Sequence, residues 1–228
     1  MKAVLFDIDG TIIRAHGAGK ASIIKATIDT FGTVGIMEKV NFQGKTDPKI
    51  LYESLTGNGI TREIIDLNIN KLKKNYFKYL RSEIKKSGVT LMPGIKNILP
   101  TLSTDKNIML GLLTGNFSES AKIKLSSHNL NKYFKVGIFG DDTAERNEMP
   151  FIAQKKICAN FSIDIDFSNM VIIGDTVHDI ECAKKSGAIS ISVGTGWTEK
   201  SILLSHNPHY YFDDFSDIEL VIDTIIKC

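Results

Sequence analysis

The sequence predicts an α/β fold in which a parallel sheet, covered by helices on both faces, is interrupted by an α-helical insertion. Short apolar runs alternate with helical patterns over most of the chain, as they do in open parallel sheets. Residues 15–88 break this alternation, because they contain no convincing buried strand and have helical patterns instead. We therefore expect a core domain formed by residues 1–14 and 89–228, and a helical domain formed by residues 15–88.

Five apolar runs are the candidate strands of the core. Each run is apolar on both faces, which is typical of central strands in a parallel sheet because helices cover both sides. The runs comprise residues 3–7, 108–116, 136–142, 170–176 and 189–196.

Helical patterns separate the later runs. They cover residues 118–130, 150–161 and 178–187. Pro150 is favoured in the first turn of a helix, and Gly187 is typical of the position just after a helix ends.

The insertion is expected to contain three helices. They cover residues 19–32, 46–57 and 61–88. Asp47 is a suitable N-cap for the second helix, with Pro48 following as its first residue. The third helix carries an apolar stripe at helical spacing, so it has one face to bury.

Composition excludes several classes of protein. The chain has 228 residues and a net charge of +2, which does not indicate a nucleic-acid partner. Its three cysteines form no CxxC pair, so neither a disulfide framework nor a zinc site is expected. No run approaches the roughly 18 apolar residues of a membrane span. We expect a cytoplasmic protein with reduced thiols.

Polar residues follow the candidate strands at the edge where open α/β sheets bind ligands. Asp7 and Asp9 follow the first run, and the sets Thr114-Gly115-Asn116, Asp141-Asp142 and Asp175-Thr176 with Asp179 end later ones. Clustered carboxylates need a nearby cation to remain ionised together. All-oxygen ligands favour Mg²⁺ over zinc, although each residue taken singly could instead cap a turn. For Asp141 and Asp142, capping of a surface loop is the favoured interpretation.

Three of these segments resemble motifs of the haloacid dehalogenase-like hydrolase superfamily. They are "DIDGT" at 7–11, "LLTGN" at 112–116 and "GDTVHD" at 174–179, in the order that the superfamily shows. The resemblance covers essentially the whole chain and implies a Rossmann-like core with a helical cap at residues 15–88. A second aspartate, here Asp9, is typical of the phosphatases of the superfamily and is lacking in its dehalogenases.

The resemblance implies a role for each matching residue. Asp7 would be the nucleophile that forms an aspartyl phosphate. Asp9 would protonate the leaving group and later deprotonate the attacking water. The Thr114 hydroxyl would bind a phosphate oxygen, together with the amides of Gly115 and Asn116.

A metal site is implied by the same motifs. Asp7, the main-chain carbonyl of Asp9 and Asp175 would hold Mg²⁺, and Asp179 would orient a metal-bound water or its neighbours.

The sequence departs from the superfamily at its remaining motif, which is usually a lysine followed by proline. The matching stretch, residues 144–156, has no such pair. Arg146 is expected to supply the missing positive charge, with Lys155 and Lys156 as the alternative. A surface ion pair of Arg146 with Glu145 or Glu148 is the structural alternative to this role.

The expected function is Mg²⁺-dependent hydrolysis of a small phosphomonoester, with greatest resemblance to phosphoglycolate phosphatases. Lys45, in the cap segment at residues 42–47, would bind an anionic group of the substrate, or would simply be a solvated loop lysine. Two alternatives are a phosphosugar mutase similar to β-phosphoglucomutase and a non-catalytic phosphate-binding module. The partner is expected to be a small phosphorylated metabolite, not a nucleic acid or a membrane, and the chain a monomer or homodimer.

Overall fold

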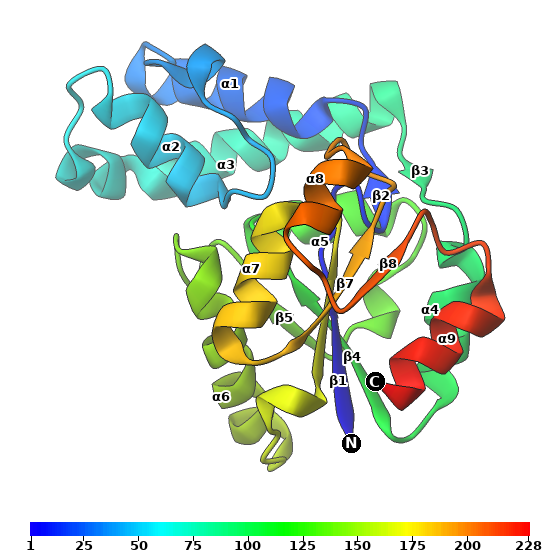
Figure 1. Cartoon of the computed structure of the whole chain (residues 1–228). Coiled ribbons are helices and arrows are strands. Elements are labelled where there is room, and N and C mark those ends of the chain that lie inside the picture. The colour runs from blue at the N-terminus through cyan, green and yellow to red at the C-terminus, as the bar shows by residue number, and fades with distance from the viewer.

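The computed structural model describes residues 1–228 and contains one six-stranded parallel sheet. The strand order is β5-β4-β1-β6-β7-β8, so the first strand lies inside the sheet (Figure 1). The strands are β1 (Lys2–Phe6), β4 (Ile108–Leu113), β5 (Val136–Ile138), β6 (Met170–Gly174), β7 (Ile189–Val193) and β8 (Tyr210–Phe212). The predicted α/β fold is confirmed.

Helices cover both faces of the sheet, and their apolar sides form two separate hydrophobic clusters with the strands. On one face lie α4 (Ile95–Thr104), α5 (Ser118–Ser126) and α9 (Ile218–Lys227). On the other lie α6 (Met149–Phe161) and α7 (Val177–Ser186), while α8 (Lys200–Ser205) follows β7. Because both faces are covered, β4 and β6 are buried along their whole length.

The register of the three central strands brings their carboxyl ends together. Phe6, at the end of β1, is paired with Leu112 of β4 on one side and with Ile173 of β6 on the other. The chain therefore leaves all three strands at the same edge of the sheet, directly below the helical insertion (Figure 1).

The insertion consists of α1 (Ala18–Phe31), α2 (Asp47–Thr56) and α3 (Arg62–Ser87), with a short 3₁₀ helix at Met37–Lys39. Helix α1 packs along α3 (Figure 1). The insertion is joined to the sheet by an antiparallel ribbon of β2 (Ile13–Arg14) and β3 (Thr90–Leu91). The boundaries at residues 14 and 89 remain a prediction, and they lie within or next to this ribbon. No helix combines the length and the apolar character that crossing a membrane requires.

Several elements differ from the sequence-based expectation. The strands end earlier than the apolar runs, because the last residues of each run already belong to the loops that follow the strands. Helix α5 ends at Ser126 rather than at residue 130. Helices α4, α8 and α9 and strand β8 were not predicted; β8 is a three-residue edge strand that is only partly buried.

The cap of helix α2 also differs from the prediction. Thr46, not Asp47, is the N-cap, and its hydroxyl accepts a hydrogen bond from the Lys49 amide at 3.2 Å. The Asp47 carboxylate does not cap the helix and instead contacts the core, where it accepts a hydrogen bond from the Phe117 amide at 2.9 Å.

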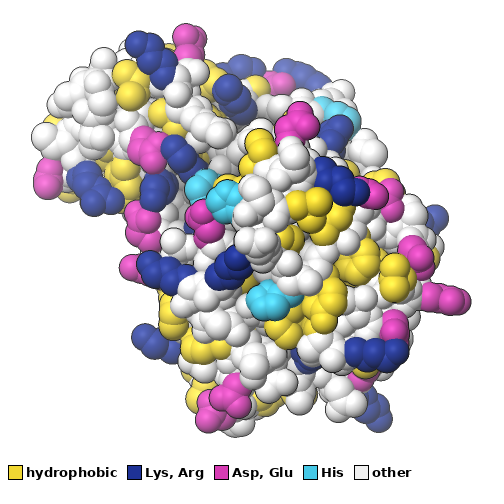
Figure 2. All heavy atoms as spheres, in the orientation of Figure 1, with side chains coloured by type: hydrophobic (Ala, Val, Ile, Leu, Met, Phe, Trp, Pro, Cys, Tyr) yellow, Lys and Arg dark blue, Asp and Glu magenta, His cyan; other side chains and the backbone are white.

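All three cysteines are free thiols, as expected from their spacing. Lys, Arg, Asp and Glu side chains are interspersed on the face shown in Figure 2, in agreement with the nearly balanced net charge.

Candidate active site

The loop after β1 places Asp7 and Asp9 at the centre of the sheet edge. The Asp7 amide donates a hydrogen bond to the carbonyl of Ile173 in β6 at 2.9 Å, so the strand pairing of the sheet extends to Asp7 and fixes its backbone. Gly10 follows with a φ of 88°, which a residue without a side chain adopts at little cost. Thr11, expected to stabilise this turn, is fully buried and donates a hydrogen bond to Asp175 at 3.0 Å.

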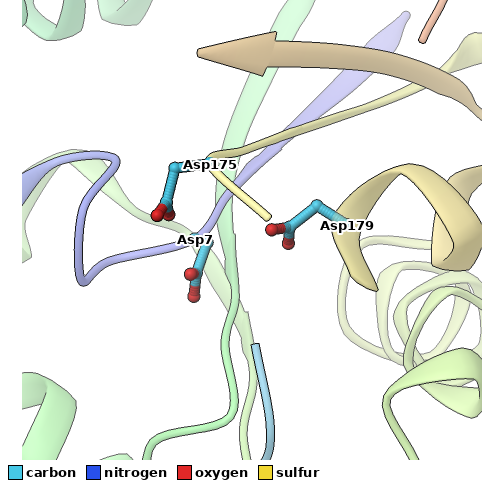
Figure 3. A group of neighbouring side chains, drawn as sticks. All are labelled: Asp7, Asp175 and Asp179. Atoms are coloured by element: carbon cyan, nitrogen blue, oxygen red, sulfur yellow. The ribbon is translucent and has the colours of Figure 1, made fainter. Parts of the chain in front are cut away.

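Three buried carboxylates point toward one another beyond the ends of β1 and β6 (Figure 3). One oxygen from each of Asp7, Asp175 and Asp179 lies within 4.8 Å of the others. Gly10 and Gly196 leave the space that Asp175 occupies, because a Cβ atom at either position would overlap its carboxylate. The trio is thus a built arrangement and not a chance cluster on the surface.

The electrostatics of this trio favour the binding of a cation. The pKa of Asp7 is raised to about 6, chiefly by burial; Arg146 opposes this rise, and the charges of Asp179 and Asp9 add to it. The pKa of Asp175 lies well above its ordinary value, first because of burial and then because of Asp7 and Asp179. A divalent cation would allow these carboxylates to ionise together, so the residues present fit a metal that prefers oxygen ligands.

Asp179 differs from the other two because its oxygens are already engaged by the protein. Its Oδ2 accepts hydrogen bonds from the Thr176 amide at 3.1 Å and the Thr176 hydroxyl at 2.7 Å. Its Oδ1 pairs with Arg146 at 2.5 Å. These contacts suit a residue that supports the site rather than one that donates both oxygens to a metal.

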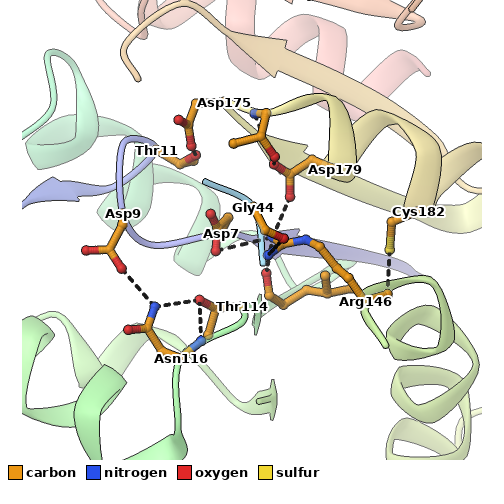
Figure 4. A network of polar contacts seen from close by, with 12 residues as sticks. Asp7, Asp9, Thr11, Gly44, Thr114, Asn116, Arg146, Asp175, Asp179 and Cys182 are labelled. Atoms are coloured by element: carbon orange, nitrogen blue, oxygen red, sulfur yellow. Dashed lines mark hydrogen bonds and ion pairs between the residues drawn. The ribbon is translucent and has the colours of Figure 1, made fainter. Parts of the chain in front are cut away.

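Arg146 is buried beside this trio, with 7% of its surface exposed. One guanidinium nitrogen lies 2.5 Å from Asp179 and 3.3 Å from Asp7, so a single cation bridges two carboxylates (Figure 4). The neighbouring nitrogen donates to the carbonyl of Gly44 in the cap at 3.3 Å. These carboxylates raise the pKa of Arg146 despite its burial, so the side chain remains charged.

The surface ion pair considered for Arg146 is wrong. Glu145 pairs instead with Lys49 at 2.7 Å, and Glu148 accepts a hydrogen bond from Thr143 at 2.7 Å.

The lysines considered as alternatives to Arg146 do not lie near Asp7. Lys155 is exposed, and Lys156 pairs with Asp142 at 2.6 Å outside the site. Asp142 also accepts a hydrogen bond from the Phe139 amide at 3.0 Å, and Asp141 accepts one from the Ser118 amide at 2.5 Å. Asp142 therefore caps its own loop, as expected, whereas Asp141 caps the start of α5 and pairs with Lys73 of α3 at 2.6 Å.

Asp9 is held by two residues that lie on the other side of Asp7. Its Oδ2 accepts hydrogen bonds from Lys124 at 2.6 Å and from the side-chain amide of Asn116 at 2.9 Å. Lys124 was not identified from the sequence. Its burial could have been suspected from helical spacing, because Lys124 follows Ala121 by three residues and so lies on the buried face of the helix.

Thr114, Gly115 and Asn116 form the turn after β4 that was predicted to bind a phosphate. The Thr114 hydroxyl is buried and accepts a hydrogen bond from the Asn116 side chain at 2.9 Å. The cap lies directly on Gly115, whose carbonyl accepts a hydrogen bond from the Asp47 amide at 2.7 Å. A Cβ atom on Gly115 would lie 2.7 Å from Cα of Thr46, so only glycine allows this approach.

A cavity of about 340 Å³ lies between the cap and the ends of the strands. Its floor contains Asp7, Asp9, Thr114 and Asp175, and Lys45 and Phe42 line it from the cap.

Lys45 lines this cavity from the segment expected to contact the substrate, but it does not project into it as a free charge. It is partly buried and forms an ion pair with Glu53 of helix α2.

Comparison with known proteins gives a consistent result. A family model described as haloacid dehalogenase-like hydrolase matches residues 4–193. A phosphoglycolate phosphatase of Salmonella typhi is 23% identical over 234 residues, covering 96% of this chain and 91% of that protein. A phosphoglycolate phosphatase of Neisseria meningitidis is 26% identical over 214 residues, covering 89% and 84% of the two proteins.

Solved structures show the same fold at lower identity. A hydrolase from Pseudomonas syringae superposes with a TM-score of 0.70 at 21% identity, covering 99% of each chain. CbbY from Rhodobacter sphaeroides, solved in complex with phosphate, superposes with a TM-score of 0.65 at 16% identity, covering 96% of each chain. The family model spans most of the chain, and the sheet edge carries the residues of the three motifs. The protein therefore belongs to the haloacid dehalogenase-like hydrolase family, as its sequence predicted.

Proposed function

We propose that the protein is a Mg²⁺-dependent phosphatase that hydrolyses a small phosphomonoester through an aspartyl phosphate on Asp7. One observation carries this proposal: Asp7 lies on the floor of the cavity between cap and sheet, between the cation Arg146 and the carboxylate of Asp175. Asp9 lies at the same floor, and only its Oδ2 is held by protein donors, so its Oδ1 could act on the leaving-group side of a bound phosphoryl group.

The metal would be held by the carboxylates of Asp7 and Asp175 and by the main-chain carbonyl of Asp9, with Asp179 in support. When bound, Mg²⁺ supplies positive charge that stabilises the oxygens of the transferred phosphoryl group. Arg146 provides part of the same compensation from the protein, since it contacts Asp7 directly.

The first step forms the bond between an Asp7 oxygen and phosphorus and breaks the bond from phosphorus to the leaving oxygen. Asp9 donates a proton to that oxygen, which leaves as an alcohol. In the second step Asp9 takes a proton from water, the water oxygen attacks phosphorus, and Asp7 is released as a carboxylate. The Thr114 hydroxyl and the amides of Gly115 and Asn116 would bind the phosphoryl oxygens.

The proposed substrate is a small phosphorylated metabolite of the size that the cavity admits, such as phosphoglycolate. The similarity to phosphoglycolate phosphatases over most of the chain supports this choice. Lys45 would bind an anionic group on the leaving half of the substrate, exchanging its pairing with Glu53 for the substrate.

The proposal is tested by measuring phosphate release with Mg²⁺ over a panel of phosphomonoesters. The wild type should turn over at least one of them, and Asp7→Asn should reduce kcat by about 10³-fold or more, because an amide cannot form the phosphoenzyme. Unfolding by urea should show that the variant is folded.

Product analysis separates this function from its alternatives. A phosphatase releases inorganic phosphate and the free alcohol. A phosphosugar mutase would return an isomeric phosphosugar, and a binding module would give no turnover with any substrate. Either of the last two results would contradict the proposal.

A further inference from the structure

Lys124 is a buried lysine on the side of helix α5 that faces the cap. Only 4% of its surface is exposed. An ammonium group removed from water is strongly destabilising unless charges or hydrogen bonds replace its hydration. Here it is bonded to Asp9 Oδ2 and to Asn116 Oδ1, each at 2.6 Å.

Asn116 completes a closed arrangement with these two residues. Its amide nitrogen donates to the same Asp9 oxygen at 2.9 Å and to the Thr114 hydroxyl at 2.9 Å. Because the lysine can only donate, it fixes which end of the Asn116 amide faces it and hence which end faces Asp9. The Asp9 carboxylate thus has Oδ2 held by two donors, whereas Oδ1 has no hydrogen bond to the protein.

The cap covers this arrangement. Gly19, in the first turn of α1, is so close that a Cβ atom there would lie 3.3 Å from the Lys124 nitrogen and 3.8 Å from the hydroxyl of Tyr76 in α3. The lysine is therefore enclosed between core and cap and has little freedom to take another rotamer.

The geometry points to Lys124 as a positioning residue for the proton-transfer chemistry of Asp9. By holding Oδ2, it leaves Oδ1 directed to the oxygen of the leaving group and later to the attacking water. The inference rests on the proposed function, in which Asp9 moves the proton. It differs from a structural role, because loss of a residue that only stabilised the site would slow all substrates alike, whether or not their leaving group needs a proton.

The test compares two substrates that differ in their need for a proton. An alkyl phosphate needs protonation of its leaving oxygen, whereas 4-nitrophenyl phosphate releases a stable phenolate without it. In Lys124→Met, the single-turnover rate of the alkyl phosphate should fall by about 10- to 100-fold. The first turnover of 4-nitrophenyl phosphate should stay within about threefold of the wild type.

Later turnovers give a second readout. Water attack on the phosphoenzyme also uses Asp9, so the variant should release a burst of about one equivalent of nitrophenol per enzyme, followed by a slow steady state. The KM values should change little, and Lys124→Arg, which keeps a cation, should recover part of the alkyl phosphate rate.

Lys122→Met is the matched control, because Lys122 is exposed two residues earlier on the same helix. It should leave both rates unchanged. If Lys124→Met does not fold, Lys124→Gln carries the same comparison with a shorter polar side chain.

Equal slowing of the first turnover with both substrates, or a raised KM with unchanged kcat, would overturn the inference. The first result would indicate a general structural role, and the second a role in binding substrate. Failure of the proposed function would be seen separately, as absence of turnover by the wild type.

Discussion

At the scale of single residues, the site is organised by two buried cations that serve different aspartates. Arg146 contacts Asp7 and Asp179, whereas Lys124 contacts Asp9. The two carboxylates with opposite duties in the proposed reaction, nucleophile and proton carrier, thus have separate electrostatic partners. This separation explains how one short loop can hold both without competition for the same charge.

Replacement of Arg146 tests the first of these cations. Arg146→Ala should lower kcat by about 10²–10³-fold, because the negative charge of Asp7 and the phosphoryl group loses its compensation. It should also lower the free energy of unfolding by about 3–5 kcal/mol, since Asp179 is left buried without its partner. Arg146→Lys should recover part of both losses.

Lys155→Ala serves as the control for this measurement, because Lys155 is exposed. It should change neither kcat nor stability noticeably. A nearly normal kcat in Arg146→Ala, together with a loss in Lys155→Ala, would show that the charge comes from helix α6.

At the scale of the elements, helix α2 of the cap supplies a hydrogen-bond acceptor to the start of a core helix, α5. Asp47, in the first turn of α2, accepts a hydrogen bond from the amide of Phe117, which is the N-cap residue of α5. Its amide donates in turn to the carbonyl of Gly115. One residue of the cap therefore fixes both the turn at residues 114–116, which is predicted to bind phosphate, and the start of the helix that carries Lys124.

The pH dependence of stability should report this contact. Burial raises the pKa of Asp47 to about 6, compared with an ordinary value of 3.8, and the nearby charge of Lys124 lowers it only in part. The folded protein holds this proton more tightly than the unfolded chain. The tighter binding of this proton by Asp47 therefore stabilises the folded protein fully below about pH 4, and this stabilisation is lost as the pH rises through 6.

Asp47→Asn keeps an acceptor for the Phe117 amide but does not titrate. Its free energy of unfolding relative to the wild type should therefore increase from pH 4 to pH 7, by about 1–2 kcal/mol. Urea unfolding of both proteins at the two pH values measures this difference, in which the other titrating groups cancel. Asp164→Asn, at an exposed position, should show no such trend; a difference independent of pH in Asp47→Asn would contradict the assignment.

Prediction from sequence succeeded where the residues are local to a strand end. The apolar runs gave the central strands, and the residues directly after β1, β4 and β6 do meet at one edge of the sheet. It failed where a residue acts through packing of distant segments. Asp47 reaches the site because the cap docks on the start of α5, and Lys124 reaches it because α5 lies beside the loop after β1. Helical spacing places Lys124 on a buried face, but it does not identify Asp9 as the partner. Strand β8 was also missed. It is a short edge strand with only β7 beside it, so it is only partly buried and has no long apolar run to reveal it.

At the scale of the whole molecule, the buried carboxylate trio affects stability as well as chemistry. Asp7 and Asp175 have raised pKa values because burial, and then repulsion by neighbouring carboxylates such as Asp179, disfavours their charged forms. A bound divalent cation would remove this repulsion, so metal binding and folding are expected to be linked.

Metal removal tests this linkage. EDTA should abolish turnover, and Mg²⁺ should restore it, whereas Ca²⁺ should substitute poorly because it is larger and less strict in its geometry. Without substrate, Mg²⁺ at about 100 times its Kd should stabilise the wild type by about 2.7 kcal/mol, measured as a rise in Tm.

Asp175→Asn should show little or no rise in Tm with Mg²⁺, because it loses a ligand. In EDTA it should be at least as stable as the wild type, since one buried charge is gone. Full activity in chelator, or an equal rise in Tm for both proteins, would contradict a metal site at this position.

The ribbon of β2 and β3 has a consequence for how such an enzyme can diversify. Ile13 pairs with Leu91 and Arg14 with Thr90, so the chain leaves the core and re-enters it at adjacent points. The whole insertion is therefore a single loop whose two ends are held together at the sheet. The entropic cost of closing such a loop grows only slowly with its length. A different set of helices could be grafted between these two short strands without moving Asp7, Asp9 or Asp175. Recombination at this junction would exchange the cap residues that line the cavity, while the aspartates at the sheet edge would be inherited unchanged.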